Sequence, residues 1–357
     1  MSILSAGLGI LAASAATQPT TAGTDIDPAT AIWTNLLFIF FTLVAAILVI
    51  RLGVVRPAGV LGPQRVRSTH ALWMLLIAGF VGFCAWQFVG GLYGAYRVNQ
   101  WQHAGIENAA SRVKELLTPA DWAILSTIPP LAAFMTLIAC EAIFAPGNLT
   151  AIGFAFRNFF GGIGTGILAF LITGPLLMWT MIVCEAVYHV IHFEHPREHE
   201  LLKNLGEVGL GWPAVLLVLG ATVVAPLLEE LLFRGHLQTF FRELFYRWST
   251  PPDSTAVADL TPSDDIAAAP ATNLTASVVL TRSAPARAWQ AWAAIVVTSL
   301  LFASLHEGWM RPPIFVLSLS LGYVYERTGN LWSSITVHLL FNLLNTLQYV
   351  LFLRGHL

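Results

Sequence analysis

Two adjacent carboxylates, Glu229 and Glu230, most constrain how this chain can fold. The twenty residues before them, 209–228, carry no charged side chain, and Arg234 follows four residues after Glu230. Charged groups at membrane depth are costly, so such residues usually face the protein interior and serve a function. We therefore expect the rest of the chain to fold around this pair.

The composition is typical of a chain that spans a membrane several times. Of its 357 residues, 56% are hydrophobic and 11% are charged, whereas a soluble domain has about a quarter charged residues. The net charge of -2 and the lack of a basic block give no indication of a nucleic-acid partner. Cys84, Cys140 and Cys184 each lie in an apolar run, without metal or disulfide spacing. The sequence predicts an all-α, multi-pass helical bundle in the lipid bilayer.

Eight apolar runs are expected to cross the membrane, whose hydrocarbon core is about 30 Å thick. The expected spans are 31–50, 71–90, 122–144, 159–184, a span that begins at 209, 289–306, 313–325 and 331–353. The segment 92–120 is polar enough to predict a loop with a short helix. In the fourth span, closely spaced glycines predict tight contact with another helix; these are Gly161, Gly162, Gly164 and Gly166.

The predicted membrane domain covers 31–357, with a tail before it and a loop insertion within it. Residues 1–30 predict a disordered or interfacial tail, with a cleaved signal segment as the alternative. Residues 249–288 are rich in Pro, Ser, Thr and Ala and predict a disordered, dispensable loop. Four arginines follow the first span and no Lys or Arg precedes it, which predicts an external N-terminus and a cytoplasmic 249–288 loop. In a bacterial cell we expect the plasma membrane.

Three polar clusters interrupt the apolar spans of 205–353. They are Glu229, Glu230 and Arg234, then Phe302 and His306, then His338 and Asn342. Glu230 and Arg234 share a helix face and can pair, whereas Glu229 points about 100° away and is free for another task. Imidazole and amide groups inside apolar spans need polar partners. We expect all three clusters to converge on the glutamates.

The predicted helix geometry supports this convergence. If the helix of Glu229 continues to Arg247, it lies antiparallel to the helix of 289–306, because the two flank one insertion. Glu229 and His306 then lie at nearly equal depth in the membrane. A modest tilt of the helix of 331–353 brings His338 close to them. We expect the three side chains within about 8 Å of one another, which allows for one bridging water or ion.

These residue types supply what amide hydrolysis needs. A carboxylate can act as general base on a water molecule. Two neutral histidines can orient that water, or Glu229, His306 and His338 can bind one zinc ion and leave its fourth position open. The Asn342 amide can donate to a developing oxyanion. The spacing alone leaves the metal-free and the zinc-dependent arrangements both open.

The three motifs, in this order on separate spans, resemble the type II CAAX prenyl endopeptidase family, also called the CPBP family of intramembrane proteases. The motifs are Glu-Glu-x-x-x-Arg, Phe-x-x-x-His and His-x-x-x-Asn, and the first four spans match only in character. The resemblance implies that Glu229 activates the water, His306 and His338 position it, and Asn342 helps form the oxyanion site. It implies that 31–357 is an intramembrane protease domain, with supporting roles for Glu230, Arg234 and Phe302.

The resemblance also implies a peptide or membrane-protein substrate and either no cofactor or one zinc ion. Eukaryotic members of the family cut after a prenylated cysteine, but many bacterial relatives have no assigned substrate. Two alternatives of another class remain: a proton-coupled transporter with Glu229 and Glu230 as its relay, and a binding module without catalysis. A transporter predicts flux that depends on an ion gradient, without peptide cleavage.

Several other polar residues are weaker candidates for a functional site. A second histidine cluster, formed by His189, His192, His195 and His199 near Glu185, predicts a metal site less well than a solvated loop, since Pro196 interrupts the periodicity. Glu141 and Glu185 are predicted to be lone carboxylates at the membrane interface.

Overall fold

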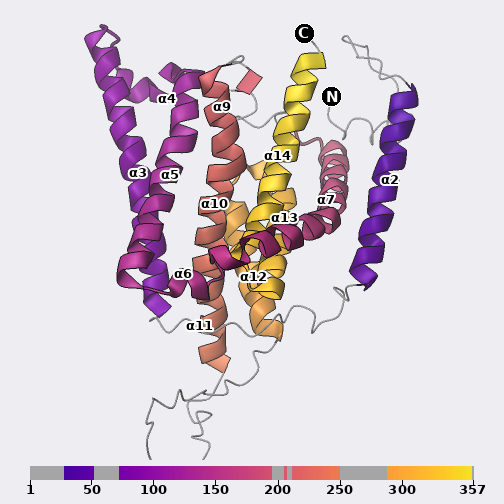
Figure 1. The fold of residues 1–357 in the computed structure, drawn as a ribbon. Coiled ribbons are helices and arrows are strands. Elements are labelled where there is room, and N and C mark those ends of the chain that lie inside the picture. The colour runs from indigo at the N-terminus through magenta and orange to yellow at the C-terminus, as the bar shows by residue number, and fades with distance from the viewer. Residues whose placement is uncertain (1–27, 52–71, 195–204, 207–210, 250–287, 356–357) are drawn as a thin grey trace, which may run out of the picture.

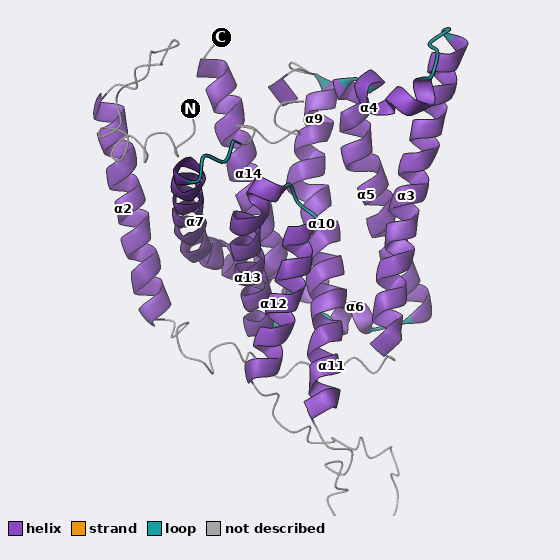
Figure 2. Cartoon of the chain, turned by 180° about the vertical axis from the view of Figure 1, so that it is seen from behind, coloured by secondary structure: helices purple, strands orange, loops and turns teal. Residues whose placement is uncertain are grey.

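The computed structural model describes residues 28–51, 72–194, 205–206, 211–249 and 288–355. These residues form helices and short connections without any strand (Figure 2), as expected for an all-α fold. The predicted tail of 1–30 and loop of 249–288 lie almost entirely outside the described residues, as do His195 and His199.

The first half of the chain contains four long helices. The long helices are α2 (Pro28–Arg51), α3 (Leu72–His103), α5 (Pro119–Phe144) and α7 (Phe159–Val190). The connections contain η2 (Ala109–Arg112), α4 (Val113–Leu116), α6 (Asn148–Ala151) and η3 (Phe156–Asn158). α5 begins with a capping box between Thr118 and Asp121, and Pro119 occupies the first helical position after Thr118.

The loop predicted for 92–120 begins later than expected, because α3 continues to His103. The polar residues that suggested a loop find partners within the fold. Tyr93 donates a hydrogen bond of 2.6 Å to Asp121, and Arg97 forms an ion pair of 2.9 Å with the same carboxylate at the start of α5. These contacts satisfy polar groups on a helix that would otherwise favour solvent.

The second half forms one long helical rod and three further helices. The rod contains α9 (Trp212–Leu219), η4 (Gly220–Val224), α10 (Ala225–Glu230), η5 (Leu231–Gln238) and α11 (Thr239–Ser249). The helices α12 (Ala288–Ser304), α13 (Arg311–Thr328), with the short η7 (Gly308–Met310) before it, and α14 (Leu331–Gly355) follow. Unlike the regular α-helix expected here, η4 and η5 are π-helical.

The predicted continuation of the rod beyond Glu229 to Arg247 is confirmed. The Phe245 and Trp289 rings lie 6.3 Å apart, so the end of α11 and the start of α12 are neighbours. Since the chain leaves one helix and enters the other at this level, α11 and α12 are antiparallel, as predicted (Figure 1).

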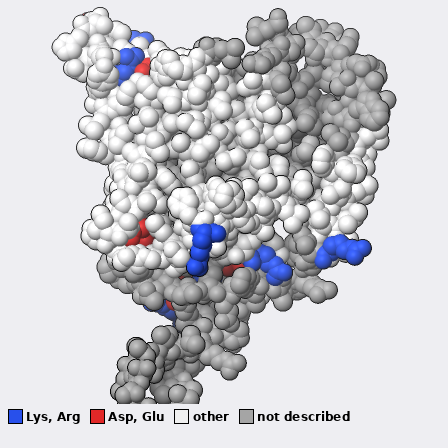
Figure 3. Space-filling model, viewed as in Figure 1, with Lys and Arg blue, Asp and Glu red and all other residues white. Residues whose placement is uncertain are grey.

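The described residues include four helical stretches that are long and apolar enough to cross a membrane. They are Leu76–His103, Pro119–Phe144, Asn148–Val190 and Trp212–Ser249, with Phe38–Arg51 and Ala288–Ser304 as shorter apolar helices. A broad surface belt without charged residues separates two levels that carry them (Figure 3). The chain is therefore an integral multi-pass membrane protein, and the number of eight spans stays a prediction.

The rod, α12, α13 and α14 form the centre of the bundle, between α3 and α5 on one side and α2 and α7 on the other (Figures 1 and 2). Two buried apolar clusters support this centre. Leu231, directly after the carboxylate pair, packs with Leu137 and Ile335 in one cluster. Phe302 packs with Leu317 in the other. The polar site lies between them.

The tight contact predicted for the glycine-rich span is confirmed at two of its four glycines. A Cβ atom on Gly162 would lie 2.5 Å from Cβ of Trp332, and one on Gly166 would lie 2.4 Å from Cβ of Thr336. Gly161 and Gly164 have no such neighbour within 4 Å. The contact therefore joins α7 to α14, which carries the third motif.

We expect Gly162→Ala to destabilise the protein, because the new methyl group forces α7 and α14 apart. Overpacking of this kind typically costs about 1–3 kcal/mol. Gly164→Ala is the matched control on the same helix, and its added methyl group meets open space. We expect the control to unfold at the wild-type temperature or above, because alanine favours a helix over glycine by about 1 kcal/mol. Thermal unfolding in detergent compares the two variants.

Candidate active site

The buried centre of the site is an ion pair between Glu230 and Arg234. Nη1 of Arg234 lies 3.1 Å from Oε1 of Glu230, and neither residue is exposed. Nη2 of Arg234 donates a hydrogen bond of 2.8 Å to the Ser318 hydroxyl on α13. The guanidinium carbon lies 4.7 Å from the centre of the Phe302 ring. The pairing predicted from the four-residue spacing is confirmed, and Arg234 also ties the rod to α12 and α13.

His338 of α14 lies between the two glutamates. Its Nδ1 is 3.0 Å from Oε1 of Glu230, and its Nε2 is 3.7 Å from Oε2 of Glu229. His338 is buried, whereas 24% of the Glu229 side chain is exposed. The first and third motifs therefore meet, and only Glu229 of the carboxylate pair is open to an incoming molecule.

Hydrogen bonding defines the tautomer of His338. Oε1 of Glu230 also faces Arg234, so this oxygen is an ionised acceptor and Nδ1 of His338 donates to it. In the neutral imidazole, Nε2 then carries a lone pair and points towards Glu229. Two acceptor groups 3.7 Å apart favour a water molecule that donates to both.

The second motif joins the site through Phe302. The Phe302 ring centre lies 4.8 Å from that of His306 and 6.0 Å from that of His338. His306 lies just after the end of α12, is half-buried, and its Nδ1 donates to the Phe302 carbonyl oxygen at 2.8 Å. Its Nε2 is therefore an acceptor in the neutral ring, as in His338.

Asn342 lies one helical turn after His338, and its side-chain amide is held by the rod. Nδ2 donates a hydrogen bond of 2.8 Å to the carbonyl oxygen of Ala221, in π-helical η4. An asparagine amide carries two N–H groups, so this bond positions the side chain and uses one of them.

A cavity of about 210 Å³ opens beside Glu229. Its lining comes from α3, α5 and the rod: Trp86, Ser126, Pro130, Gly220, Ala221, Ala225, Leu228 and Glu229. The lining is mostly apolar, with the Glu229 carboxylate as its charged group. Since Ala221 also accepts the bond from Asn342, the cavity wall contacts residues of two predicted motifs.

The side chains proposed to bind zinc do not form a complete set. Glu229 and His338 approach each other, and both histidines present Nε2 atoms suited to a metal. However, the described part of the chain contains no group of three or more His, Cys, Asp or Glu side chains that fits a metal ion. The same holds for His189 and His192, the two described members of the second histidine cluster. The donor chemistry fits zinc, but the geometry does not.

A second buried carboxylate–histidine pair escaped the sequence analysis. Glu141, predicted to be a lone interfacial carboxylate, is buried and lies 2.7 Å from Nε2 of His236, while Asn148 donates to its other oxygen at 2.6 Å. The prediction was wrong because burial in the folded bundle supplies partners from distant segments. The available signal was that Glu141 and His236 each interrupt an apolar stretch and need a partner.

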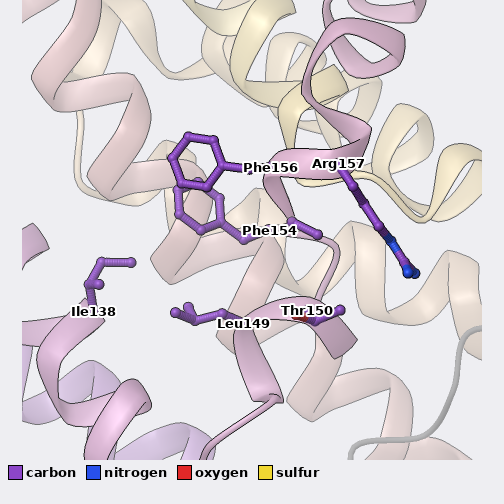
Figure 4. A pocket seen from close by; sticks show the side chains of 7 residues that line it. Ile138, Leu149, Thr150, Phe154, Phe156 and Arg157 are labelled. Atoms are coloured by element: carbon purple, nitrogen blue, oxygen red, sulfur yellow. The ribbon is translucent and has the colours of Figure 1, made fainter.

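A larger cavity, of about 460 Å³, has none of the predicted site residues in its lining (Figure 4). Its lining includes the apolar side chains of Ile138, Leu149, Phe154 and Phe156, together with Arg157. None of the predicted site residues reaches this mostly apolar cavity, so it lies apart from the candidate active site.

The fold and this site together define a multi-pass helical membrane protein with a buried glutamate–histidine centre. Residues 211–260 and 268–344 match the family described as Type II CAAX prenyl endopeptidase Rce1-like. This part of the chain is therefore similar to the CPBP family of membrane proteases, which are hydrolases. The matched residues contain all three motifs. No curated protein and no solved structure matches the chain.

Proposed function

We propose that the protein is an intramembrane endopeptidase in which Glu229 is the general base. The observation that carries this proposal is the position of Glu229 at the cavity, 3.7 Å from the Nε2 acceptor of His338. Glu230 is unsuited to this role, because it is fully buried and paired with Arg234. A water molecule that bridges Glu229 and His338 from the cavity side would donate to both and lose its proton to the carboxylate.

The other motif residues would orient the attacking water and stabilise the oxyanion. His338 is held by Glu230, so its Nε2 has a defined direction towards the water. His306 offers a second Nε2 acceptor beside Phe302. The second N–H of Asn342 would donate to the oxyanion formed when water attacks the peptide carbonyl. Arg234 and Phe302 would act indirectly, by holding this arrangement together.

The membrane environment gives the proposed reaction its physical basis. Glu229 meets a mostly apolar cavity rather than bulk solvent, and in such surroundings charge interactions are stronger than in water. The mostly apolar lining of this cavity suits an apolar group of a substrate next to the carboxylate. The family match favours this enzymatic reading over a transporter or a binding module.

The proposed function is tested by comparing the membrane proteomes of cells that express the wild type or Glu229→Gln. We expect specific membrane or membrane-associated proteins to accumulate uncut in the variant, with new termini present only in the wild type. Transport without cleavage would give the same termini in both strains. Equal termini at equal expression would contradict the proposal.

We expect the purified protein to keep its activity after dialysis against a strong chelator. The reason is that Glu229, His306 and His338 do not form a complete metal site in the described structure. Metal analysis and cleavage of a quenched-fluorescent CAAX peptide would be measured on the same samples. One equivalent of zinc whose removal abolishes cleavage, and whose return restores it, would establish the zinc-dependent alternative instead.

A further inference from the structure

The pair formed by Glu141 of α5 and His236 of η5 has no part in the proposed reaction. Nevertheless, it is buried beside the helical rod that carries the catalytic glutamates. Glu141 is 3% exposed and His236 and Asn148 are each 2% exposed. Polar groups are costly to bury unless they are hydrogen-bonded, so a cluster of three such groups calls for a structural or functional reason.

The hydrogen bonds show how many protons the cluster holds. Nδ1 of His236 lies 2.7 Å from the carbonyl oxygen of Leu231, which only accepts, so Nδ1 carries a proton. One Glu141 oxygen accepts from Asn148. The contact of 2.7 Å between the other oxygen and Nε2 then needs one proton, on either partner. In both cases Glu141 and His236 are together neutral, which suits their burial.

These bonds act on the turn that directly follows the catalytic pair. Leu231 is the next residue after Glu230, and His236 lies five residues further on in the π-helical segment. At the end of this segment, the hydroxyl of Thr239, the first residue of α11, donates to the carbonyl oxygen of Arg234 at 3.2 Å, again across five residues. π-Helical turns are rare in proteins, and those that occur often lie at functional sites. Here, side chains bind the carbonyl groups of Leu231 and Arg234, which both lie in the turn that forms the ion pair.

The cluster also connects this turn to the first half of the chain. Glu141 lies near the end of α5, and Asn148 begins α6. Both lie outside the residues that match the family, whereas His236 lies within them. Through these contacts, a part of the chain without a recognisable motif holds the segment that carries Glu230 and Arg234.

We propose that Glu141, His236 and Asn148 are positioning residues, which hold the Glu229–Arg234 turn at the geometry needed for hydrolysis. This inference rests on the proposed function of Glu229. The cluster acts through its hydrogen bonds to the Leu231 carbonyl and between α5, α6 and η5. Its proton stays within the cluster and is not passed to the substrate.

Two substitutions of one residue separate this role from simple stability. Glutamine at position 141 can keep both bonds described above: its N–H donates to Nε2 of neutral His236, and its carbonyl accepts from Asn148. Leucine removes both of them. We expect Glu141→Gln to retain the wild-type kcat and KM. We expect Glu141→Leu to lower kcat by about 10–100-fold with KM unchanged, because a misplacement of about 1 Å can cost that much.

Tyr93→Phe provides the matched control, since it removes a hydrogen bond of 2.6 Å to Asp121 at the other end of α5. We expect this variant to lose thermal stability while its folded fraction keeps the wild-type kcat. Cleavage of a quenched-fluorescent farnesylated CAAX peptide would be measured on the monodisperse fraction of each variant. The rates would be normalised to folded protein, so that yield does not enter the comparison.

Two readouts do not depend on peptidase activity. Thermal unfolding of Glu141→Leu, His236→Leu and the double variant gives the coupling of the pair, and we expect the double variant to lose no more than one single variant. Carbodiimide labelling of Glu229, followed by mass spectrometry, reports the position of the turn. We expect the labelling rate to change in Glu141→Leu and to stay unchanged in Glu141→Gln and Tyr93→Phe.

The outcomes distinguish the inference from the proposed function. A wild type that labels normally at Glu229 but cleaves nothing would contradict the proposed function, and the labelling and unfolding results would still decide the positioning role. Folded Glu141→Leu with wild-type kcat and labelling would overturn the inference. So would equal losses of kcat in Glu141→Gln and Glu141→Leu, because the proton rather than the hydrogen-bond frame would then matter.

Discussion

Glu229→Gln is expected to lower the rate of peptide cleavage by about 10²–10⁴-fold, the usual contribution of a general base. Glutamine has nearly the same size as glutamate but does not accept the proton of the attacking water. The side chain is partly exposed at a cavity, and the ion pair beside it belongs to Glu230. The variant should therefore accumulate and unfold like the wild type, while kcat falls.

Glu115→Gln is a suitable control for this experiment, because Glu115 is an exposed carboxylate in the connection before α5. It should leave both kcat and stability unchanged. Purified proteins would be compared with a quenched-fluorescent CAAX peptide at several substrate concentrations, so that kcat and KM are separated. If folded Glu229→Gln cleaves the peptide at a rate near that of the wild type, Glu229 is not the base.

Glu230→Gln is expected to have its main effect on folding rather than on chemistry. Removing one partner of a buried ion pair leaves the other charge uncompensated and typically costs about 3–5 kcal/mol. Arg234 has no exposed surface, and its hydrogen bond to the uncharged Ser318 hydroxyl does not balance its charge. We expect a lower yield of folded protein and a large decrease in the unfolding temperature.

The same rod offers a matched control, the Glu243–Arg247 pair, which has the same four-residue spacing. Its atoms lie 3.2 Å apart, but 54% of the Arg247 side chain is exposed. Glu243→Gln should cost less than about 1 kcal/mol, as is usual for surface pairs. Replacing Arg234 by Met in the Glu230→Gln background removes the unpaired charge and should recover stability. Equal costs for the buried and exposed single variants would refute the role assigned to the ion pair.

The sequence by itself determined the class of protein and the local part of the site. Long apolar runs require helices in a membrane, because backbone polar groups must be satisfied within each segment. The Glu230–Arg234 pair follows from a spacing of four residues on one helix. The path of the rod beyond Glu229 could also be predicted, since an amphipathic continuation and the flanking insertion left few alternatives.

The sequence led us to expect His338 near the glutamates, but only the tertiary structure decided which atoms of distant groups meet. His338 lies 108 residues from Glu230 and reaches both glutamates, and His236 lies 95 residues from Glu141. Such contacts depend on how whole helices pack, which a spacing within one helix does not define. Nothing in the sequence indicated the π-helical turns either; in one of them His236 contacts both the nearby Leu231 carbonyl and the distant Glu141.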